Sequence, residues 1–219
     1  MLANTLITPN YPTVDPDDKV LRALQLIDDF DILHIPILDH NIYLGLISKD
    51  DLLDADEDAP VKTMMPAMSQ KAIRQGEHFL AGLKLVTQNG LTIVPVVDAQ
   101  QEWVGAITSA DLLKALSQFT GAEEPGALIV LEMERKSYSF GEISRLIETN
   151  DAYITQFNTV TEADTGLLIA TIKINKTEIS DILATFQRYE YSIRYFIGEE
   201  QYENELQYNY DHLMSYLKI

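Results

Sequence analysis

The chain has 219 residues, of which 46% are hydrophobic, 23% charged and 9% aromatic, and it contains no cysteine. This composition predicts one or two globular domains with sizeable cores, and it excludes a disulfide scaffold, thiol catalysis and cysteine-ligated zinc. The net charge of −18 argues against binding to nucleic acid or to a membrane surface of anionic lipid.

The charge is distributed in blocks along the chain. The net charge is −10 over residues 1–60, +1 over residues 61–120, −5 over residues 121–198 and −4 over residues 199–219. Such blocks predict separate units with different surfaces. The sequence has neither a secretory leader pattern nor an apolar run of the roughly 18 residues that a membrane helix needs. We therefore expect a cytoplasmic protein.

Residues 1–58 are expected to form the first of two repeats, each built as strand, helix, strand, strand, helix. The helix is indicated by apolar residues at helical spacing, namely Val20, Leu21, Leu24 and Ile27. The apolar run 33–38 ends at Asp39 and predicts a strand. The segment Gly-Leu-Ile-Ser-Lys-Asp-Asp-Leu-Leu at 45–53 runs from a strand into a helix.

Residues 59–120 are expected to form the second repeat. The matching helix carries Phe79, Leu80, Leu83 and Val86. The matching strand, 92–97, ends at Asp98, and Gly-Ala-Ile-Thr-Ser-Ala-Asp-Leu-Leu follows at 105–113. Because one unit of this size has a thin core, two related copies facing each other would bury it.

These repeats resemble a tandem pair of CBS domains, which are named after cystathionine β-synthase. The resemblance covers residues 1–118. It rests on two apolar-Pro-apolar-apolar-Asp strands and on two Gly-x-Ile-[Ser/Thr]-x-x-Asp-Leu segments. Two copies of both segments in register are far more specific than one.

The pairs Ser48 with Asp51 and Thr108 with Asp111 have two interpretations. As capping boxes, the hydroxyl and the carboxylate satisfy the free amides at a helix N-terminus. As ligand sites, the same helix N-terminus attracts phosphate, and the carboxylate accepts the two hydroxyls of a ribose. The residues alone leave both interpretations open.

The resemblance implies that an adenosine-containing ligand binds to the CBS pair. It assigns Ser48, Thr108 and the basic Lys49 to phosphate, and Asp51 and Asp111 to ribose. It encloses the adenine with residues from both repeats, namely Thr13, Val14, Ile35, Pro36, Ala72, Ile73, Val94 and Pro95.

The expected ligand is AMP, ADP, ATP or S-adenosylmethionine. Because the first repeat is strongly acidic, a monophosphate or the cationic S-adenosylmethionine suits it at least as well as ATP, and Mg²⁺ is expected only with a polyphosphate. His34 and His78 are expected to be structural. No cofactor is required.

Residues 125–198 predict the order βαββαβ of the split ferredoxin-like arrangement. By order and size this part resembles an ACT domain, and the whole chain is similar to bacterial CBS proteins related to acetoin utilisation. The turn Arg-Lys-Ser-Tyr-Ser at 135–139 lacks the proline and glycine of amino-acid-binding relatives. This difference favours dimerisation through the sheet edge over ligand binding.

The tail, residues 199–219, carries Leu206, Tyr210, Leu213 and Leu217 at helical spacing. A helix here is expected to dock on its own domain or on a dimer mate, and the alternative is a partner-binding helix. The predicted fold is therefore α+β: a CBS pair, a ferredoxin-like domain and a C-terminal helix.

No catalytic motif is present. The four histidines have no metal-ligand spacing, and no phosphate-binding glycine loop or nucleophile elbow occurs. We expect a non-enzymatic regulatory protein without a metal site, which forms a homodimer through the CBS helices, the ACT-like sheet edge or both. The alternatives are a dimerisation scaffold with empty clefts and an amino-acid sensor that uses the ACT-like domain.

Overall fold

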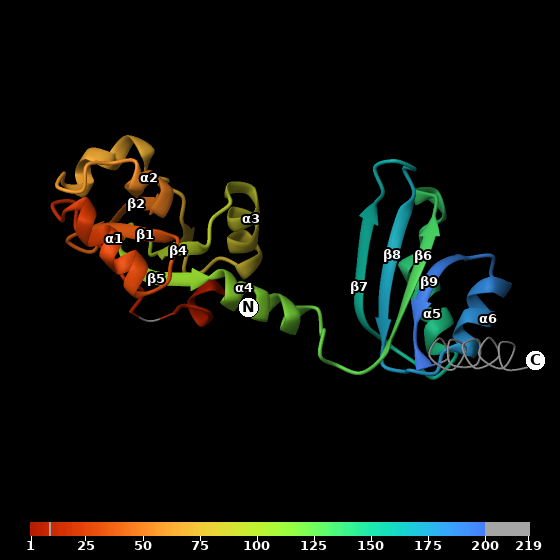
Figure 1. The fold of residues 1–219 in the computed structure, drawn as a ribbon. Coiled ribbons are helices and arrows are strands. Elements are labelled where there is room, and N and C mark those ends of the chain that lie inside the picture. The colour runs from red at the N-terminus through yellow and green to blue at the C-terminus, as the bar shows by residue number, and fades with distance from the viewer. Residues whose placement is uncertain (9, 200–219) are drawn as a thin grey trace, which may run out of the picture. The chain divides into compact units, whose positions relative to one another are not determined.

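A computed structural model describes residues 1–8 and 10–199 of the chain (Figure 1). The chain divides into two compact units, Met1–Phe119 and Thr120–Ile219. The helix expected over the tail lies outside the described residues. The combination of helices and sheets confirms the expected α+β fold.

Both repeats of the first unit contain a helix, a β-hairpin and a second helix. In the first repeat these elements are α1 (Val20–Asp29), β1 (His34–Asp39), β2 (Ile42–Ser48) and α2 (Lys49–Leu53). In the second they are α3 (Phe79–Asn89), β4 (Ile93–Val97), β5 (Trp103–Thr108) and α4 (Ser109–Phe119), preceded by the short strand β3 (Ile73–Arg74). In the first repeat, the strand expected before α1 is reduced to one parallel bridge between Val14 and Ile37.

The N-terminal segment falls within the expected bounds of the first repeat, 1–58, but it packs on the second, so the structural elements of the first repeat begin only after it. It contains the 3₁₀ turn η1 (Ala3–Thr5), and the amide of Thr8 donates to the carbonyl of Ala106 over 2.8 Å. The corresponding segment of the first repeat follows η2 (Val61–Ala67), where Ser69 and Leu46 exchange two backbone hydrogen bonds of 2.8 Å. Each hairpin therefore gains a further extended segment that the repeat pattern does not predict.

Gly105 allows the N-terminal segment to approach β5 closely. Its φ is +152°, and a Cβ at this position would lie 2.3 Å from Cγ2 of Ile7. At the equivalent Gly45, a Cβ would lie 2.9 Å from Cβ of Met68. Both glycines are required by packing, since real Cβ atoms do not come this close to their neighbours.

The tips of the two hairpins hold the repeats together. Tyr43 donates its amide to the Gln101 carbonyl over 3.0 Å, and Trp103 donates its amide to the Asn41 carbonyl over 2.8 Å. The rings of Tyr43 and Trp103 stack with their centroids 5.9 Å apart. This contact joins the two repeats into one unit.

The helical stripes read from the sequence are confirmed only in part. Val20, Leu24 and Ile27 of α1 are buried, as is Phe79 of α3. Leu21 and Leu80, however, are 39% and 41% exposed. The stripe is narrower than expected because both helices pack on their sheets through one side only.

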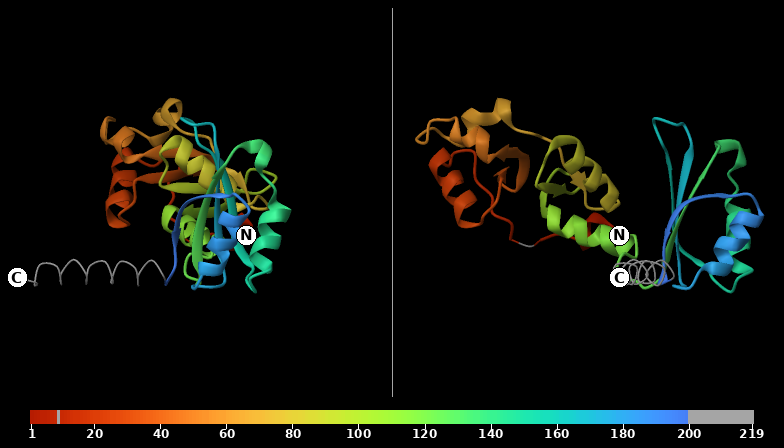
Figure 2. Two further views of the ribbon diagram at one scale, coloured as in Figure 1. Left: turned by 90° about the vertical axis from the view of Figure 1, so that its right-hand side faces the viewer. Right: turned by 45° about the vertical axis from the view of Figure 1, so that its right-hand side comes forward.

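The second unit has the predicted order βαββαβ. Its elements are β6 (Ala127–Met133), α5 (Phe140–Glu148), β7 (Ile154–Thr161), β8 (Leu168–Ile174), α6 (Ser180–Arg188) and β9 (Ser192–Ile197), with the 3₁₀ turn η3 (Arg135–Ser137) after β6. The four strands form one antiparallel sheet in the order β7-β8-β6-β9. Both helices cover the same face of this sheet (Figure 2), so the arrangement is ferredoxin-like.

Apolar side chains fill the space between the sheet and the two helices, including Ile129, Ile143, Ile172 and Phe186.

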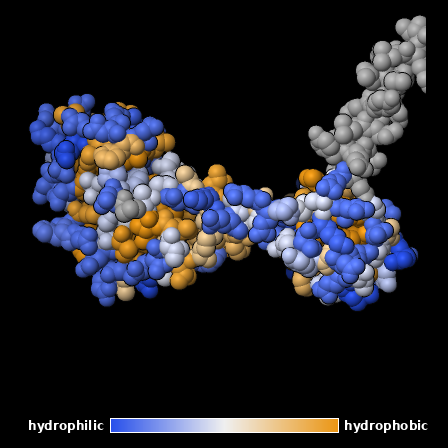
Figure 3. All heavy atoms as spheres, turned by 90° about the horizontal axis from the view of Figure 1, so that it is seen from below, coloured by the Kyte–Doolittle hydropathy of each residue, from blue (hydrophilic) through white to orange (hydrophobic). Residues whose placement is uncertain are grey.

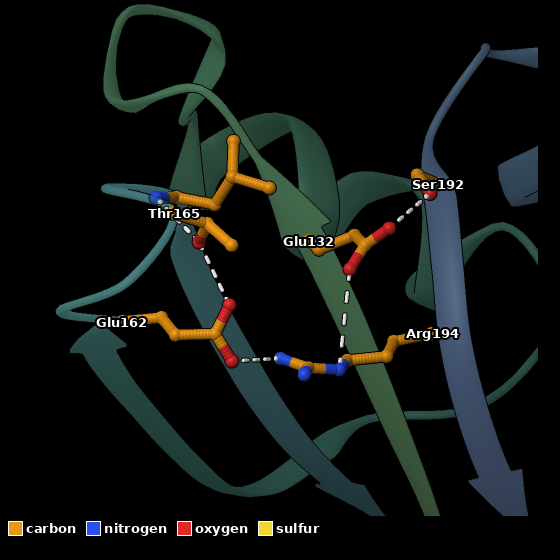
Figure 4. Close-up of polar contacts among 6 residues, drawn as sticks. Glu132, Glu162, Thr165, Ser192 and Arg194 are labelled. Atoms are coloured by element: carbon orange, nitrogen blue, oxygen red, sulfur yellow. Dashed lines mark hydrogen bonds and ion pairs between the residues drawn. The ribbon is translucent and has the colours of Figure 1, made fainter.

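Arg194 of β9 connects three parts of the sheet (Figure 4). Its guanidinium lies 2.7 Å from Glu162, in the loop between β7 and β8, and 4.0 Å from Glu132 of β6.

Hydrophobic side chains also remain open to solvent on the first unit. In the view from below, these hydrophobic side chains gather in the middle of the visible face of the first unit, with hydrophilic side chains around its rim (Figure 3).

Among the described residues, no helix combines the length and the apolar character needed to cross a membrane.

Candidate functional site

The predicted capping box is present where β5 passes into α4. The Asp111 amide donates to Oγ1 of Thr108 over 3.1 Å, and the Thr108 hydroxyl donates to Oδ2 of Asp111 over 2.6 Å. The Thr108 amide also donates to Oδ2, over 3.3 Å. Thr108 and Asp111 are thus brought together as the sequence predicts, with the carboxylate beside the N-terminus of an 11-residue helix.

A third member of this cluster, Thr8, was missed by sequence reasoning. Its hydroxyl donates to Oδ2 of Asp111 over 2.7 Å, across 103 residues of sequence. Oδ2 accepts from both hydroxyls and from the Thr108 amide, whereas among the described residues no hydrogen bond reaches Oδ1. Thr8 could not be found from the repeats, because the segment that carries it lies before the first one.

The charge of Asp111 follows from these contacts. Burial by itself would raise the pKa of this carboxyl, but the hydrogen bonds from Thr108 and Thr8 outweigh that effect and leave the pKa below its ordinary value. Asp111 is therefore an ionised acceptor at neutral pH.

The first repeat has the same box with fewer partners. The Ser48 hydroxyl donates to Oδ2 of Asp51 over 2.5 Å, and the Asp51 amide donates to Oγ of Ser48 over 3.1 Å. Ser69 occupies the position equivalent to Thr8, yet within the described part of the chain its hydroxyl makes no hydrogen bond to Asp51. Lys49, which was expected near phosphate, is paired with Asp28 over 2.7 Å.

The residues expected around adenine lie close to the strands, but most belong to the cores. The buried ones are Val14, Ile35, Pro36, Ile73, Val94 and Pro95. Thr13 and Ala72 are half-buried. The side chains of Ile35 and Val94 are enclosed by their own repeats. The expectation that Ile35-Pro36 and Val94-Pro95 form the walls of an adenine site therefore stays a prediction.

His34 connects the two repeats. Its Nδ1 lies 2.8 Å from Oγ1 of Thr92, and its carbonyl accepts a hydrogen bond from the Tyr11 hydroxyl over 3.0 Å. Burial lowers the pKa of His34. His78 caps α3 and contacts the ring of Phe79, with 4.8 Å between ring centroids. These contacts agree with structural roles for both histidines.

Comparison with known proteins identifies the class of the first unit. Residues 3–58 match the CBS domain family. The fold resembles that of a CBS domain pair/ACT domain protein from Thermotoga maritima, with 23% identity, 54% of this chain and 98% of that chain covered, and a TM-score of 0.50. Residues 3–58 therefore match a CBS domain, and the first unit has the fold of a CBS domain pair.

Curated relatives also match part of the chain. Inosine-5′-monophosphate dehydrogenase of Methanocaldococcus jannaschii is 25% identical over 149 residues, which cover 67% of this chain and 30% of the enzyme. An uncharacterized protein of the same organism is 20% identical over 110 residues, 50% of this chain and 42% of the relative. The chain thus spans less than half the length of either curated relative. The resemblance to acetoin-utilisation proteins and the ACT-like nature of the second unit stay predictions.

Proposed function

We propose that the CBS pair is a non-catalytic regulatory module that binds an adenosine-containing ligand at Asp111. The observation that carries this proposal is the geometry of the carboxylate. Thr8 and Thr108 hold Oδ2 in place, while Oδ1 has no partner among the described residues. A ribose presents two adjacent hydroxyl donors, and the ionised carboxylate can accept both.

The surroundings of Asp111 also suit a phosphate. Helix α4, with 11 residues, directs the positive end of its dipole toward the site. The stretch 61–120 has a net charge of +1, against −10 for residues 1–60. We therefore expect the second repeat to bind the anionic part of AMP or ADP more readily than the first.

The site at Asp51 is the weaker of the two in this proposal. Its helix, α2, has only five residues and so provides a small dipole. Asp50 lies within its first turn, and Lys49 is paired with Asp28. A cationic ligand such as S-adenosylmethionine, or a polyphosphate accompanied by Mg²⁺, fits this potential better than free ATP.

The main alternative is a scaffold with empty clefts. The capping box gives this alternative a physical basis, because Thr108 and Asp111 satisfy each other without any ligand. An amino-acid sensor is less well supported. A hollow of about 370 Å³ beside η3 is lined by Glu132, Glu134, Glu142 and Glu190 among others, and these carboxylates would repel that of an amino acid.

Calorimetric titration tests the proposal. AMP, ADP, ATP, S-adenosylmethionine and a set of amino acids are titrated into the full chain and into two matched variants, Asp111→Asn and Asp51→Asn. We expect an adenosyl compound to bind, with at least a tenfold loss in Asp111→Asn and a much smaller loss in Asp51→Asn, since one charge-assisted hydrogen bond contributes about 1.5–3 kcal/mol.

Two results would count against the proposal. If no adenosyl compound binds up to millimolar concentration, the scaffold remains. If one binds equally well to both variants, the ribose is held elsewhere. Urea unfolding of the same variants shows whether Asp111→Asn loses affinity only because it is less stable. We expect the weakened cap to lower the free energy of unfolding by about 1 kcal/mol.

In the wider proposal, ligand binding changes how two copies of the chain, or the CBS pair and the second unit, are arranged. It includes no catalytic step and no required cofactor, and it places the protein in the cytoplasm.

A further inference from the structure

The sheet of the second unit has one face that α5 and α6 leave uncovered (Figure 2). Side chains that alternate along the strands with those of the core point to this face. Six apolar side chains define this open sheet face and form three cross-strand pairs, namely Val130 with Tyr195, Leu128 with Ile197, and Val160 with Ile169. Tyr195 is 51% exposed, and Ile197 and Val160 are each 57% exposed. An apolar surface that crosses all four strands indicates that another segment covers it.

The chain leaves the sheet at the edge of the open sheet face. Strand β9 ends at Ile197, and the amide of Glu199, the last described residue, donates to the Thr177 carbonyl over 3.1 Å. Residues 200–219 follow. As a helix, these 20 residues would span about 30 Å, whereas the seven residues of β6 or of β8 span about 23 Å. The tail is therefore long enough to cross the whole sheet.

The tail carries an apolar stripe that matches this surface. Its apolar positions recur at spacings of 4, 3 and 4, namely Leu206, Tyr210, Leu213 and Leu217. In a helix this spacing places them on one side, with Asn204 and Ser215 on the other. The spacing by itself does not say which surface receives the stripe.

Charge distinguishes the open sheet face from the other surfaces near the start of the tail. The tail begins with three carboxylates, Glu200, Glu203 and Glu205. A hollow of about 450 Å³ at the start of α6 is lined by three carboxylates and one lysine, and the hollow beside η3 is lined by four carboxylates, so both would repel the tail. On the open sheet face, Lys173 lies opposite Leu128 in the ladder, and its ammonium donates to a carbonyl and not to a carboxylate. Its charge attracts the acidic start of the tail.

We propose that residues 200–219 fold back on the open sheet face of their own unit, with the stripe from Leu206 to Leu217 on the three apolar pairs. Because the tail is tethered to β9, its effective concentration is roughly millimolar, and modest contacts are enough to hold it. The sheet then has a helical layer on both faces. The tail thereby competes with any other protein for the surface around Tyr195.

Acrylamide quenching of a tryptophan placed on the open sheet face tests the proposal. Tyr195→Trp is made in a Trp103→Phe background, so that the fluorescence reports position 195 alone. Two tail variants are compared in this background: Leu206→Glu with Leu213→Glu, and the matched control Asn204→Glu with Ser215→Glu. We expect the quenching constant to rise about twofold in the first and to stay unchanged in the control, because only the stripe shields a side chain that is otherwise 51% exposed.

A chain that ends at Glu199 should give the same quenching constant as the variant with Leu206→Glu and Leu213→Glu, which shows that the added charges act by releasing the tail. The proposal is wrong if the parent protein, this shortened chain and both variants are quenched equally. It is also wrong if the quenching constant falls as the protein concentration rises from about 1 to about 100 μM, because a tail that binds within its own chain is independent of concentration. That outcome would assign the cover to another copy.

Discussion

The hydroxyl of Thr8 is the contact that most sharply tests how the CBS pair is built. It comes from the N-terminal segment, before the first repeat, and donates to Oδ2 of Asp111 over 2.7 Å. Thr8→Val keeps the shape of the side chain and removes only this donor. We therefore expect Thr8→Val to destabilise the first unit through Asp111.

The expected loss follows from the type of bond. Hydrogen bonds to charged groups contribute about 1.5–3 kcal/mol, and those between neutral groups about 1 kcal/mol. Asp111 is half-buried and keeps the hydroxyl of Thr108 at 2.6 Å, so we expect a loss below the range for charged groups, about 1 kcal/mol. With a urea slope of about 2 kcal/mol per molar, the midpoint should fall by about 0.5 M.

Tryptophan fluorescence provides the assay for this unit alone. Trp103 is the single tryptophan of the chain, and it lies in β5, stacked on Tyr43. Urea unfolding followed at this residue therefore reports the CBS pair and not the ferredoxin-like unit. Thr8→Ser retains the hydroxyl and is the matched control.

The pH dependence gives an independent check. The pKa of Asp111 is lowered in the folded chain, so its contribution to stability is complete above the unfolded pKa of about 3.9 and is lost as the pH falls through the folded value. The difference between Thr8→Val and wild type should shrink at acidic pH. The reasoning is refuted if Thr8→Val matches wild type at pH 7, or if it costs as much in an Asp111→Ala background as in wild type.

Three further results are expected. Gly126→Ala should destabilise the second unit by about 3 kcal/mol or more, because φ is +149° and a Cβ would lie 2.0 Å from the Ile174 carbonyl oxygen; circular dichroism should detect this without any change in the tryptophan transition. Arg194→Met should leave the urea midpoint of the second unit nearly unchanged, despite the 2.7 Å contact with Glu162, because solvent screens this partly exposed pair, and a clear fall in the midpoint would contradict this expectation. Because burial lowers the pKa of His34, unfolded chains take up its proton first, so the first unit should lose stability as the pH falls from 6.5 toward the folded value. His34→Gln should reduce this dependence, and an unchanged profile would contradict it.

The repeats could be found from the sequence because their determinants are local. Each strand has a proline in its middle and an aspartate at its end at matching positions, and Ser48 and Thr108 mark two helix starts. The structure confirms both boxes, Ser48 with Asp51 and Thr108 with Asp111. A contact between residues three positions apart follows from chain geometry, and no tertiary information is needed for it.

The packing of the same helices was less predictable. The spacing of Leu21 and Leu80 fits a buried stripe, yet both are exposed. Ile35 and Val94, by contrast, are enclosed in the cores of their repeats. Periodicity marks a side chain as apolar, but it does not say which apolar side chains the neighbouring elements will cover.

The sequence alone determined the duplication, the order of strands and helices in both units, and the two hydroxyl–carboxylate pairs. Each of these features depends on residues that are close together in the chain. The tertiary structure alone brought Thr8 to Asp111, joined His34 to Thr92 and paired Lys49 with Asp28. These contacts link residues between 21 and 103 positions apart. They depend on how the elements pack, because the free energy of packing selects which distant segments lie side by side.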